Sequence, residues 1–307
     1  MPMRRILYFG LLLPLSKLPL CVLSGVKPFL FILLYHGMRY RKSTVMENID
    51  KSFPEKSTEE KNRIRTKFYW HLSTLIIESV KNMGFSAKQL EQRIQFVNAE
   101  KVRAYLDQRR NVVIVGGHFG NWEWVITSLG GEFTKNLFGL GMPMTDRFWD
   151  HKLTAKRERF GLKVIHSKNH KEFLSNPSNH PFVILMLSDQ SPGDSHKSFW
   201  MNFLNQTTAV QFGSENMANQ SDAVVFYYHM NRVKNGRYEV VFELVTDTPK
   251  TEDYGFITST HTALLEKDIR LNPSQWMWSH KRWKREIPPN LDDLFEAQKI
   301  KFNKKYR

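Results

Sequence analysis

The sequence predicts an α/β fold: one domain with a central, mixed or largely parallel sheet flanked by helices, preceded by a membrane-anchoring helix. Residues 112–115 and 182–187 are short runs of aliphatic and aromatic side chains, typical of strands covered on both faces. Helical patterns separate the first three predicted strands, and such alternation favours a layered α/β domain. An apolar segment lies only at the N-terminus. We therefore divide the chain into residues 1–42, an anchor, and residues 43–307, a globular domain.

The overall composition is that of a folded, strongly basic protein. The 307 residues include 45 Lys and Arg against 30 Asp and Glu, a formal charge of +15, and 41% are hydrophobic. This usage argues against a disordered chain and against a polytopic membrane protein. The charge predicts an anionic partner, such as nucleic acid, anionic lipid or an acidic protein. The single cysteine, Cys21, excludes an internal disulfide and a cysteine-cluster metal site.

The N-terminal apolar segment consists of two stretches with basic flanks. Residues 6–13 follow two arginines, and residues 18–35 are interrupted by Lys27 and Pro28 before the basic residues 39–42. Neither stretch supplies the roughly 20 uninterrupted apolar residues of a clean bilayer span. No convincing small-residue cleavage site follows, although a signal peptide stays an alternative. We expect a short anchor or a pair of interfacial helices, with a buried soluble helix as the other interpretation.

The elements of the domain follow from local signals. Ser57 and Glu60 have the spacing of a capping box, and apolar residues at spacings of three and four from Ile64 to Met83 predict a helix that ends before Gly84. A second helix is predicted over residues 99–109. Four strands are predicted, at residues 112–115, 182–187, 223–228 and 238–245.

A histidine motif follows the first predicted strand, as Gly116-Gly117-His118-Phe119-Gly120-Asn121-Trp122-Glu123. Ligands of open α/β sheets bind where strands end. Asn121 suits a helix cap and Glu123 the first helical turn. A chain reversal would let Glu123 accept a hydrogen bond from the imidazole of His118, leaving the second ring nitrogen free as a base. By spacing alone, a lone histidine in a glycine-rich loop is usually an ordinary solvated or hydrogen-bonded loop residue.

Residues 118–123 resemble the His-x4-Asp/Glu motif of glycerolipid acyltransferases. They are most similar to the His-Phe-Gly-Asn-Trp-Glu version of the bacterial lipid A late acyltransferases, the lauroyl and myristoyl transferases. The resemblance extends over residues 44–285, with the family's segments in the same order. Those segments are residues 48–55, the Arg-Glu-Arg-Phe-Gly run at 157–161, Asp189-Gln190, and the aromatic and basic run at 273–284.

The resemblance implies transfer of a fatty acyl chain from acyl-carrier protein, or acyl-CoA, to a hydroxyl of a lipid A precursor. It places the enzyme at the cytoplasmic face of the bacterial inner membrane, and it implies no cofactor and no metal. In this interpretation His118 removes the proton of the acceptor hydroxyl, and Glu123 orients the imidazole.

Four further residues are predicted to bind substrate. Asn121 is a candidate donor to the oxyanion, and Arg159 a candidate contact for phosphate or oxyanion, with a solvated basic helix face as the alternative. Asp189 and Gln190 either orient substrate or support the strand end structurally. Trp276, Trp278 and Trp283 suit a membrane interface, with core packing as the alternative for one or two of them.

Two departures from the family pattern leave the acceptor open. Met142-Pro143 stands where the family has Arg-Pro, and Phe203-Leu204-Asn205 where it has Phe-Phe-Gly. An acyltransferase acting on another glycerolipid or aminolipid is therefore the alternative enzyme. Nucleic-acid binding is the non-enzyme alternative, given an isoelectric point near 9.8, but no zinc-finger spacing or RNA-recognition signature supports it. We expect no nucleic-acid partner.

Overall fold

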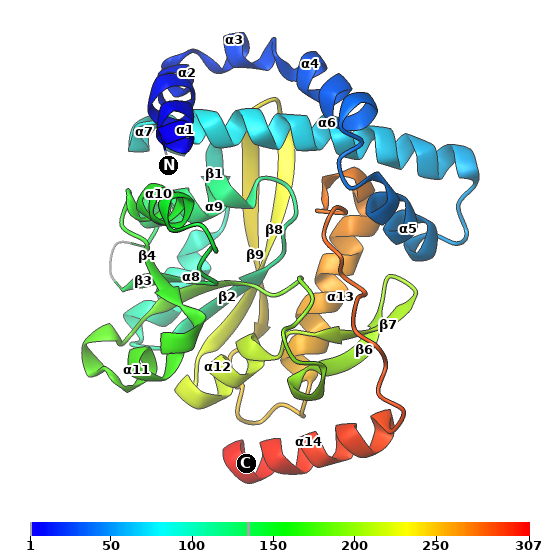
Figure 1. The fold of residues 1–307 in the computed structure, drawn as a ribbon. Helices are drawn as coiled ribbons and strands as arrows, with labels where there is room; N and C mark the ends of the chain where they lie inside the picture. The colour runs from blue at the N-terminus through cyan, green and yellow to red at the C-terminus, as the bar shows by residue number, and fades with distance from the viewer. Residues whose placement is uncertain (1, 134–135) are drawn as a thin grey trace.

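A seven-stranded sheet forms the centre of the computed structural model, which describes residues 2–133 and 136–307 (Figure 1). Neighbouring strands are parallel except for the antiparallel hairpin of β8 and β9, so the predicted mixed, largely parallel sheet is confirmed. In spatial order the strands are β1 (Ile94–Phe96), β9 (Arg237–Thr246), β8 (Val224–Lys234), β2 (Val112–Gly116), β5 (Val183–Leu187), β3 (Leu137–Gly141) and β4 (Lys163–His166).

The central strand β2 is buried on both faces, as its sequence predicts. Val112 and Ile114 pack into one hydrophobic cluster, which contains Trp124 of α9. Val113 and Val115 pack into the cluster on the other face. Because successive side chains of a strand point to opposite faces, a continuous apolar run is what a two-sided core requires.

Helices cover both faces of the sheet, and a small hairpin of β6 (Phe199–Phe203) and β7 (Gln206–Val210) lies beside it. The predicted capping box at Ser57 is confirmed, since its side chain accepts from the Glu60 amide and Glu60 accepts from the Ser57 amide. The helices are α5 (Lys42–Ser52), α6 (Thr58–Asn82), α7 (Ala87–Glu91), α8 (Ala99–Asp107), α9 (Trp122–Ser128), α10 (Arg147–Glu158), α11 (His170–Ser175), α12 (Gly213–Ser221), α13 (Phe256–Leu271) and α14 (Leu291–Tyr306).

The N-terminal helices run along α6 at one end of the molecule, and α14 lies at the opposite end (Figure 1). Lys81 of α6 donates to the Ser16 carbonyl at 3.0 Å, and the Lys27 ammonium lies 4.3 Å from the ring centroid of Trp70. One stretch, Leu20–Gly37, is long and apolar enough to cross a bilayer by length and composition. These helices comprise α1 (Pro2–Arg5), η1 (Ile6–Leu12), α2 (Leu13–Lys17), α3 (Leu20–Ser24), α4 (Lys27–Ile32) and η2 (Leu33–Gly37).

The outer surface of these helices is apolar. Large side chains with at least about half of their surface exposed include Ile6, Phe9, Val22, Phe29 and Ile32. Their inner surface contacts the globular domain along its length, from Tyr8 beside Phe148 to Tyr69, whose hydroxyl donates to the Tyr40 carbonyl. The proposed division of the chain at residue 42 stays a prediction.

Candidate active site

Two neighbouring strand ends bring His118 and Asp189 together. Gly116 of β2 and Leu187 of β5 are partners in the parallel ladder. His118 and Asp189 each lie two residues beyond the end of these strands. His118 Nδ1 is 2.7 Å from Asp189 Oδ1, and the His118 amide donates to Asp189 Oδ2 at 2.9 Å. The carboxyl edge of a parallel sheet thus gathers two groups separated by 71 residues of sequence.

Asp189 is a buried carboxylate with several donors. Besides both His118 contacts, it accepts a hydrogen bond from Trp276 Nε1 at 2.8 Å. Burial alone would raise the pKa of Asp189, but His118 and these hydrogen bonds outweigh that effect and lower the pKa to about 2. The guanidinium of Arg282, buried and bonded to Thr208 and the Ala209 carbonyl, supplies a further nearby positive charge. Asp189 is therefore ionised at neutral pH.

An ionised Asp189 fixes the tautomer of His118. The Nδ1–H donates to the carboxylate, so a neutral ring carries its lone pair on Nε2. Gln190 Nε2 lies 3.3 Å from that nitrogen, and the Trp122 ring contacts the imidazole edge-to-face at 5.1 Å between centroids. In this tautomer the Gln190 amide donates to the Nε2 lone pair, which is the group that a general base uses, and an acceptor hydroxyl would take the place of this contact.

The predicted hydrogen bond between His118 and Glu123 is wrong. Glu123, in the first turn of α9, turns toward α10 and pairs with Lys156 Nζ at 2.9 Å and with Arg157. Burial raises the pKa of Glu123, but the two cations together outweigh it and bring the pKa to about 2. Asp189 already occupies the Nδ1 side of the imidazole, and the two α10 cations hold Glu123 more strongly than a neutral ring could.

Asn121 lies inside the structure instead of at a substrate surface. Its side-chain oxygen accepts from the Trp124 amide at 3.2 Å, capping α9, and its Nδ2 donates to Glu78 Oε2 at 2.6 Å. Tyr238 donates to the same Glu78 oxygen at 2.6 Å. The Asn121 amide is thus engaged within a buried network, and its contact with an oxyanion stays a prediction.

Arg159 also has structural contacts within the protein, and its contact with phosphate or an oxyanion stays a prediction. Its Nη1 and Nη2 donate to the carbonyls of Met83 and Asn82 at 2.7 and 2.8 Å, which satisfies the last groups of α6. Arg157, two residues earlier in the same Arg-x-Arg segment, instead borders the pocket beside His118.

A pocket of about 660 Å³ opens next to His118, at the ends of β3 and β5. This volume is ordinary for a small-molecule or lipid-chain site. Much of its wall is apolar, and polar side chains line the part near the histidine. Apolar residues of the wall are Leu140, Met142, Leu153, Leu162, Leu185 and Leu187, and polar ones include Arg157 and Gln190. Met142, one of the two departures from the family pattern, is part of this wall.

The C-terminal aromatic segment, residues 273–284, packs against the loop that carries His118. Phe119 and Trp276 form an antiparallel bridge, the Gly120 amide donates to the Gln275 carbonyl, and the Met277 amide donates to the His118 carbonyl. Trp276 and Trp278 are 2% and 0% exposed, so the membrane-interface interpretation is wrong for these two. Sequence reasoning missed Trp276 and Arg282 as supports of Asp189, since only the fold brings residues 276–282 to the end of β5.

Comparison with known proteins gives the same family as the motifs. The profile described as bacterial lipid A biosynthesis acyltransferase matches residues 2–285. The chain is 22% identical to the lipid A biosynthesis lauroyltransferase of Escherichia coli (strain K12) over 276 residues, 90% of this chain and 89% of that protein. It is 23% identical to the lipid A biosynthesis palmitoleoyltransferase of the same organism, and to a lipid A biosynthesis acyltransferase of Shigella flexneri, each over 80% of both chains.

Proposed function

Since the chain belongs to the bacterial lipid A biosynthesis acyltransferases and is therefore an acyltransferase, we propose that it transfers a fatty acyl chain from a thioester to a hydroxyl of a lipid A precursor. His118 is the general base of this proposal. The observation that carries it is the 2.7 Å contact between His118 Nδ1 and the ionised Asp189, beside a largely apolar pocket.

The reaction requires one proton transfer that this geometry suits. His118 Nε2 takes the proton of the acceptor hydroxyl while the oxygen attacks the thioester carbonyl. Asp189 holds the neutral ring in the tautomer whose lone pair lies on Nε2, and it stabilises the imidazolium that forms in the reaction. The tetrahedral intermediate collapses as the carbon–sulfur bond breaks, and the imidazolium returns the proton to the departing thiolate. No covalent acyl-enzyme is needed, because a thiolate is already a good leaving group.

The oxyanion of the intermediate needs hydrogen-bond donors at the pocket. We assign this role to Gln190, whose amide lies beside His118, and to Arg157, whose guanidinium borders the same pocket. Glu123 then acts through Arg157 as a positioning residue, since the carboxylate holds that guanidinium in place. The acyl chain of the donor lies in the pocket against its apolar wall.

We propose acyl-carrier protein as the donor, with acyl-CoA as the alternative, and the cytoplasmic face of the inner membrane as the location. An acidic carrier protein suits the positive charge of the chain, +15 in total. The exposed apolar side chains of the N-terminal helices, flanked by basic residues 39–42, suit a lipid surface. A donor that works only when bound to carrier protein would support the first of these assignments.

The test compares His118→Ala with a matched control, His151→Ala, an exposed histidine on α10. With purified full-length protein in detergent, an acylated thioester donor and a lipid A precursor, we expect the His118 variant to lose about 10²- to 10⁴-fold in turnover. The control should keep its rate. Turnover retained by folded His118→Ala would rule out the base.

The acceptor is tested separately by mass spectrometry of lipid A from cells with and without the protein. Absence of one acyl chain in the deletion supports the lipid A acceptor. Unchanged lipid A together with altered phospholipid or aminolipid would favour the alternative acceptor, with the same base chemistry.

A further inference from the structure

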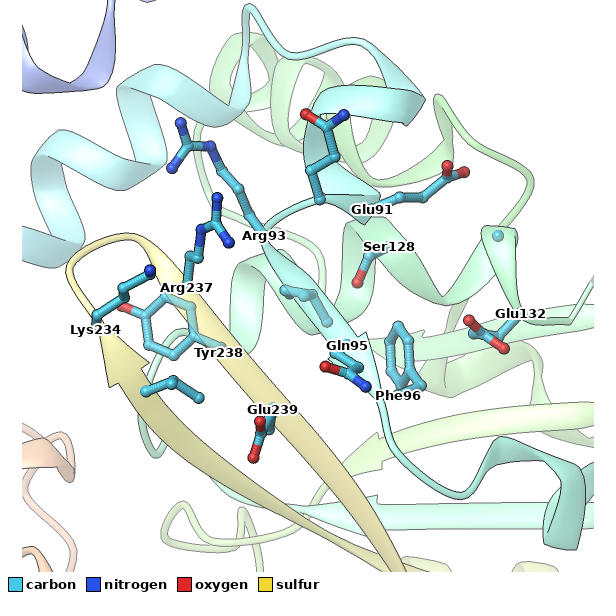
Figure 2. A pocket seen from close by; sticks show the side chains of 14 residues that line it. Glu91, Arg93, Gln95, Phe96, Ser128, Glu132, Lys234, Arg237, Tyr238 and Glu239 are labelled. Carbon is cyan, nitrogen blue, oxygen red and sulfur yellow. The ribbon is translucent and has the colours of Figure 1, made fainter.

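A second pocket, of about 480 Å³, lies away from His118, between the edge strand β1, helix α7 and the tip of the β8–β9 hairpin (Figure 2). Charged side chains line this pocket, and the positive and negative charges are unevenly distributed along it. Arg93, Lys234 and Arg237 lie toward one end, whereas Glu91 and Glu132 lie toward the other (Figure 2). The pocket therefore has a cationic end with a definite position on the molecule.

The three cations have no acidic partner within ion-pair distance in the described part of the chain. Lys234 and Arg237 are direct partners in the antiparallel ladder. Like charges directly opposite one another destabilise a strand pair. An anion bound between these side chains would remove that repulsion.

Arg93 is held in place independently of any ligand. Its Nη1 donates to the Gly236 carbonyl at 3.1 Å, and its guanidinium carbon lies 5.4 Å from the ring centroid of Phe85. Only one of its donors is used by this bond, so the remaining N–H groups are available. A pre-positioned guanidinium is well suited to phosphate, which it binds through two parallel hydrogen bonds.

More positive charge surrounds this end of the pocket. Burial lowers the pKa of Lys81, and the positive charges of the nearby Arg93 and Lys17 lower it further by electrostatic repulsion. Lys81 itself binds the Ser16 carbonyl of the N-terminal segment. Lys81 and Lys17 thus add positive charge on the Arg93 side of the pocket.

The cationic end also adjoins the apolar N-terminal helices. A Cβ added to Gly236 would come within 2.5 Å of Leu20 Cδ2, so the hairpin tip packs directly under α3. The neighbours Leu18 and Val22 are 39% and 54% exposed. Lipid head-group phosphates lie at the level where an apolar surface meets cations.

We propose that this pocket binds the phosphate of an anionic lipid, with Arg93, Lys234 and Arg237 as its ligands. A concave site of this volume fits one head group, whereas an acidic carrier protein needs a broad convex or flat surface. The phosphate belongs either to a membrane phospholipid or to the acceptor, and the second case rests on the proposed function. At the other end Glu132 is paired with Arg103 at 2.7 Å and Glu91 carries a negative charge, so this end suits the uncharged part of the head group.

The test measures binding of a monomeric short-chain phosphatidylglycerol to the full-length protein in neutral detergent by titration calorimetry. We compare Lys234→Gln/Arg237→Gln with Lys301→Gln/Lys304→Gln, a control of equal charge on α14 at the opposite end of the molecule. Each cation near an anionic head group contributes about a fivefold change in affinity, so the pocket variant should bind roughly 30-fold more weakly. The control should bind like the wild type.

A second variant separates a pocket from diffuse surface charge. Gln95→Trp fills the pocket from the exposed face of β1 and leaves every cation in place. We expect it to abolish saturable one-to-one binding. Binding that is unchanged in this variant, or that falls equally in the α14 control, would overturn the proposal.

The source of the phosphate is decided by acyl-transfer kinetics in neutral detergent. A raised KM for the acceptor with unchanged kcat in the pocket variant assigns the site to the acceptor's phosphate, and an unchanged KM assigns it to a membrane phospholipid. Weaker binding of acidic carrier protein alone, with phosphatidylglycerol binding intact, would refute the lipid site. Because head-group binding is measured without turnover, its failure is distinguishable from a failure of the proposed acyl transfer.

Discussion

Replacing Asp189 by asparagine should abolish most activity while preserving the shape of the site. An amide in place of the carboxylate presents an N–H to His118 Nδ1, which favours the tautomer with the proton on Nε2. That nitrogen then cannot accept a proton from the acceptor hydroxyl. The same change in a catalytic triad costs about 10⁴-fold, so we expect a fall in kcat of about 10³- to 10⁴-fold at neutral pH. The measurement is single-turnover acyl transfer with purified enzyme.

The stability of the same variant follows from the pKa of Asp189. The folded pKa of about 2 lies below the ordinary value of 3.8, which corresponds to about 2 kcal/mol at neutral pH for this buried group. A lowered pKa stabilises the fold above pH 4, and this stabilisation is lost as the pH falls toward 2. Asp189→Asn should lose about that amount at pH 7 and should lack that part of the acid dependence.

The control for both measurements is Asp107→Asn, an exposed aspartate at the end of α8. It should change neither kcat nor stability by a measurable amount. If folded Asp189→Asn retained kcat within tenfold of the wild type, Asp189 would not set the tautomer of His118, and the assignment of the base would need revision.

Three substitutions test the other motif residues. Glu123→Gln should lower the free energy of unfolding by about 3 kcal/mol at pH 7, because a folded pKa of about 2 lies well below 4.5. This difference in stability should shrink as the pH falls below 4.5 toward 2. The loss of kcat should be smaller than in Asp189→Asn, and equal losses of kcat in the two variants would contradict the assigned roles. Asn121→Ala should cost about 1 to 3 kcal/mol in urea unfolding, since it removes a helix cap and a partner of buried Glu78; a selective rise in KM without destabilisation would restore its substrate role. Arg159→Gln should lower the melting temperature by a few degrees, the effect of about 1 kcal/mol, and leave the acceptor KM unchanged; a large rise in KM would mark a phosphate contact.

The strands of the sheet that are buried on both faces could be predicted from the sequence, because burial requires apolar side chains there. The strands at β2 and β5 are continuous apolar runs because both faces are covered. β3 and β4 were not predicted, because β3 contains Gly139 and Gly141 and β4 has only four residues. Pairing with neighbouring strands, which is a tertiary effect, decides their structure. The β6–β7 turn was also missed, since Leu204 and Asn205 adopt positive φ values of 50° and 62° without a glycine signal.

Part of the candidate site was predicted from the sequence, namely His118, Asp189 and Gln190, but its pairings were not, nor were Arg157, Trp276 and Arg282. His118 and Asp189 each follow a strand that the sequence reveals, so both could be named. Their contact depends on β5 lying next to β2, and strand order does not follow from position along the chain. Glu123 was assigned to His118 because the two are close in sequence. The direction of the Glu123 side chain determines its partner, since the first turn of α9 points this carboxylate toward α10.

The separation of the two carboxylates makes chemical sense of the motif. A free Glu123 beside His118 would compete with Asp189 for the ring and leave the tautomer undefined. Lys156 and Arg157 prevent this, because two cations around one carboxylate leave a local charge of +1 near the pocket. In the proposed reaction that excess charge would favour an oxyanion on the thioester carbonyl, while Asp189 would favour the imidazolium formed in the same step. The two α10 cations and Asp189 therefore act on opposite charges of the proposed transition state, and Glu123 only holds the cations in place.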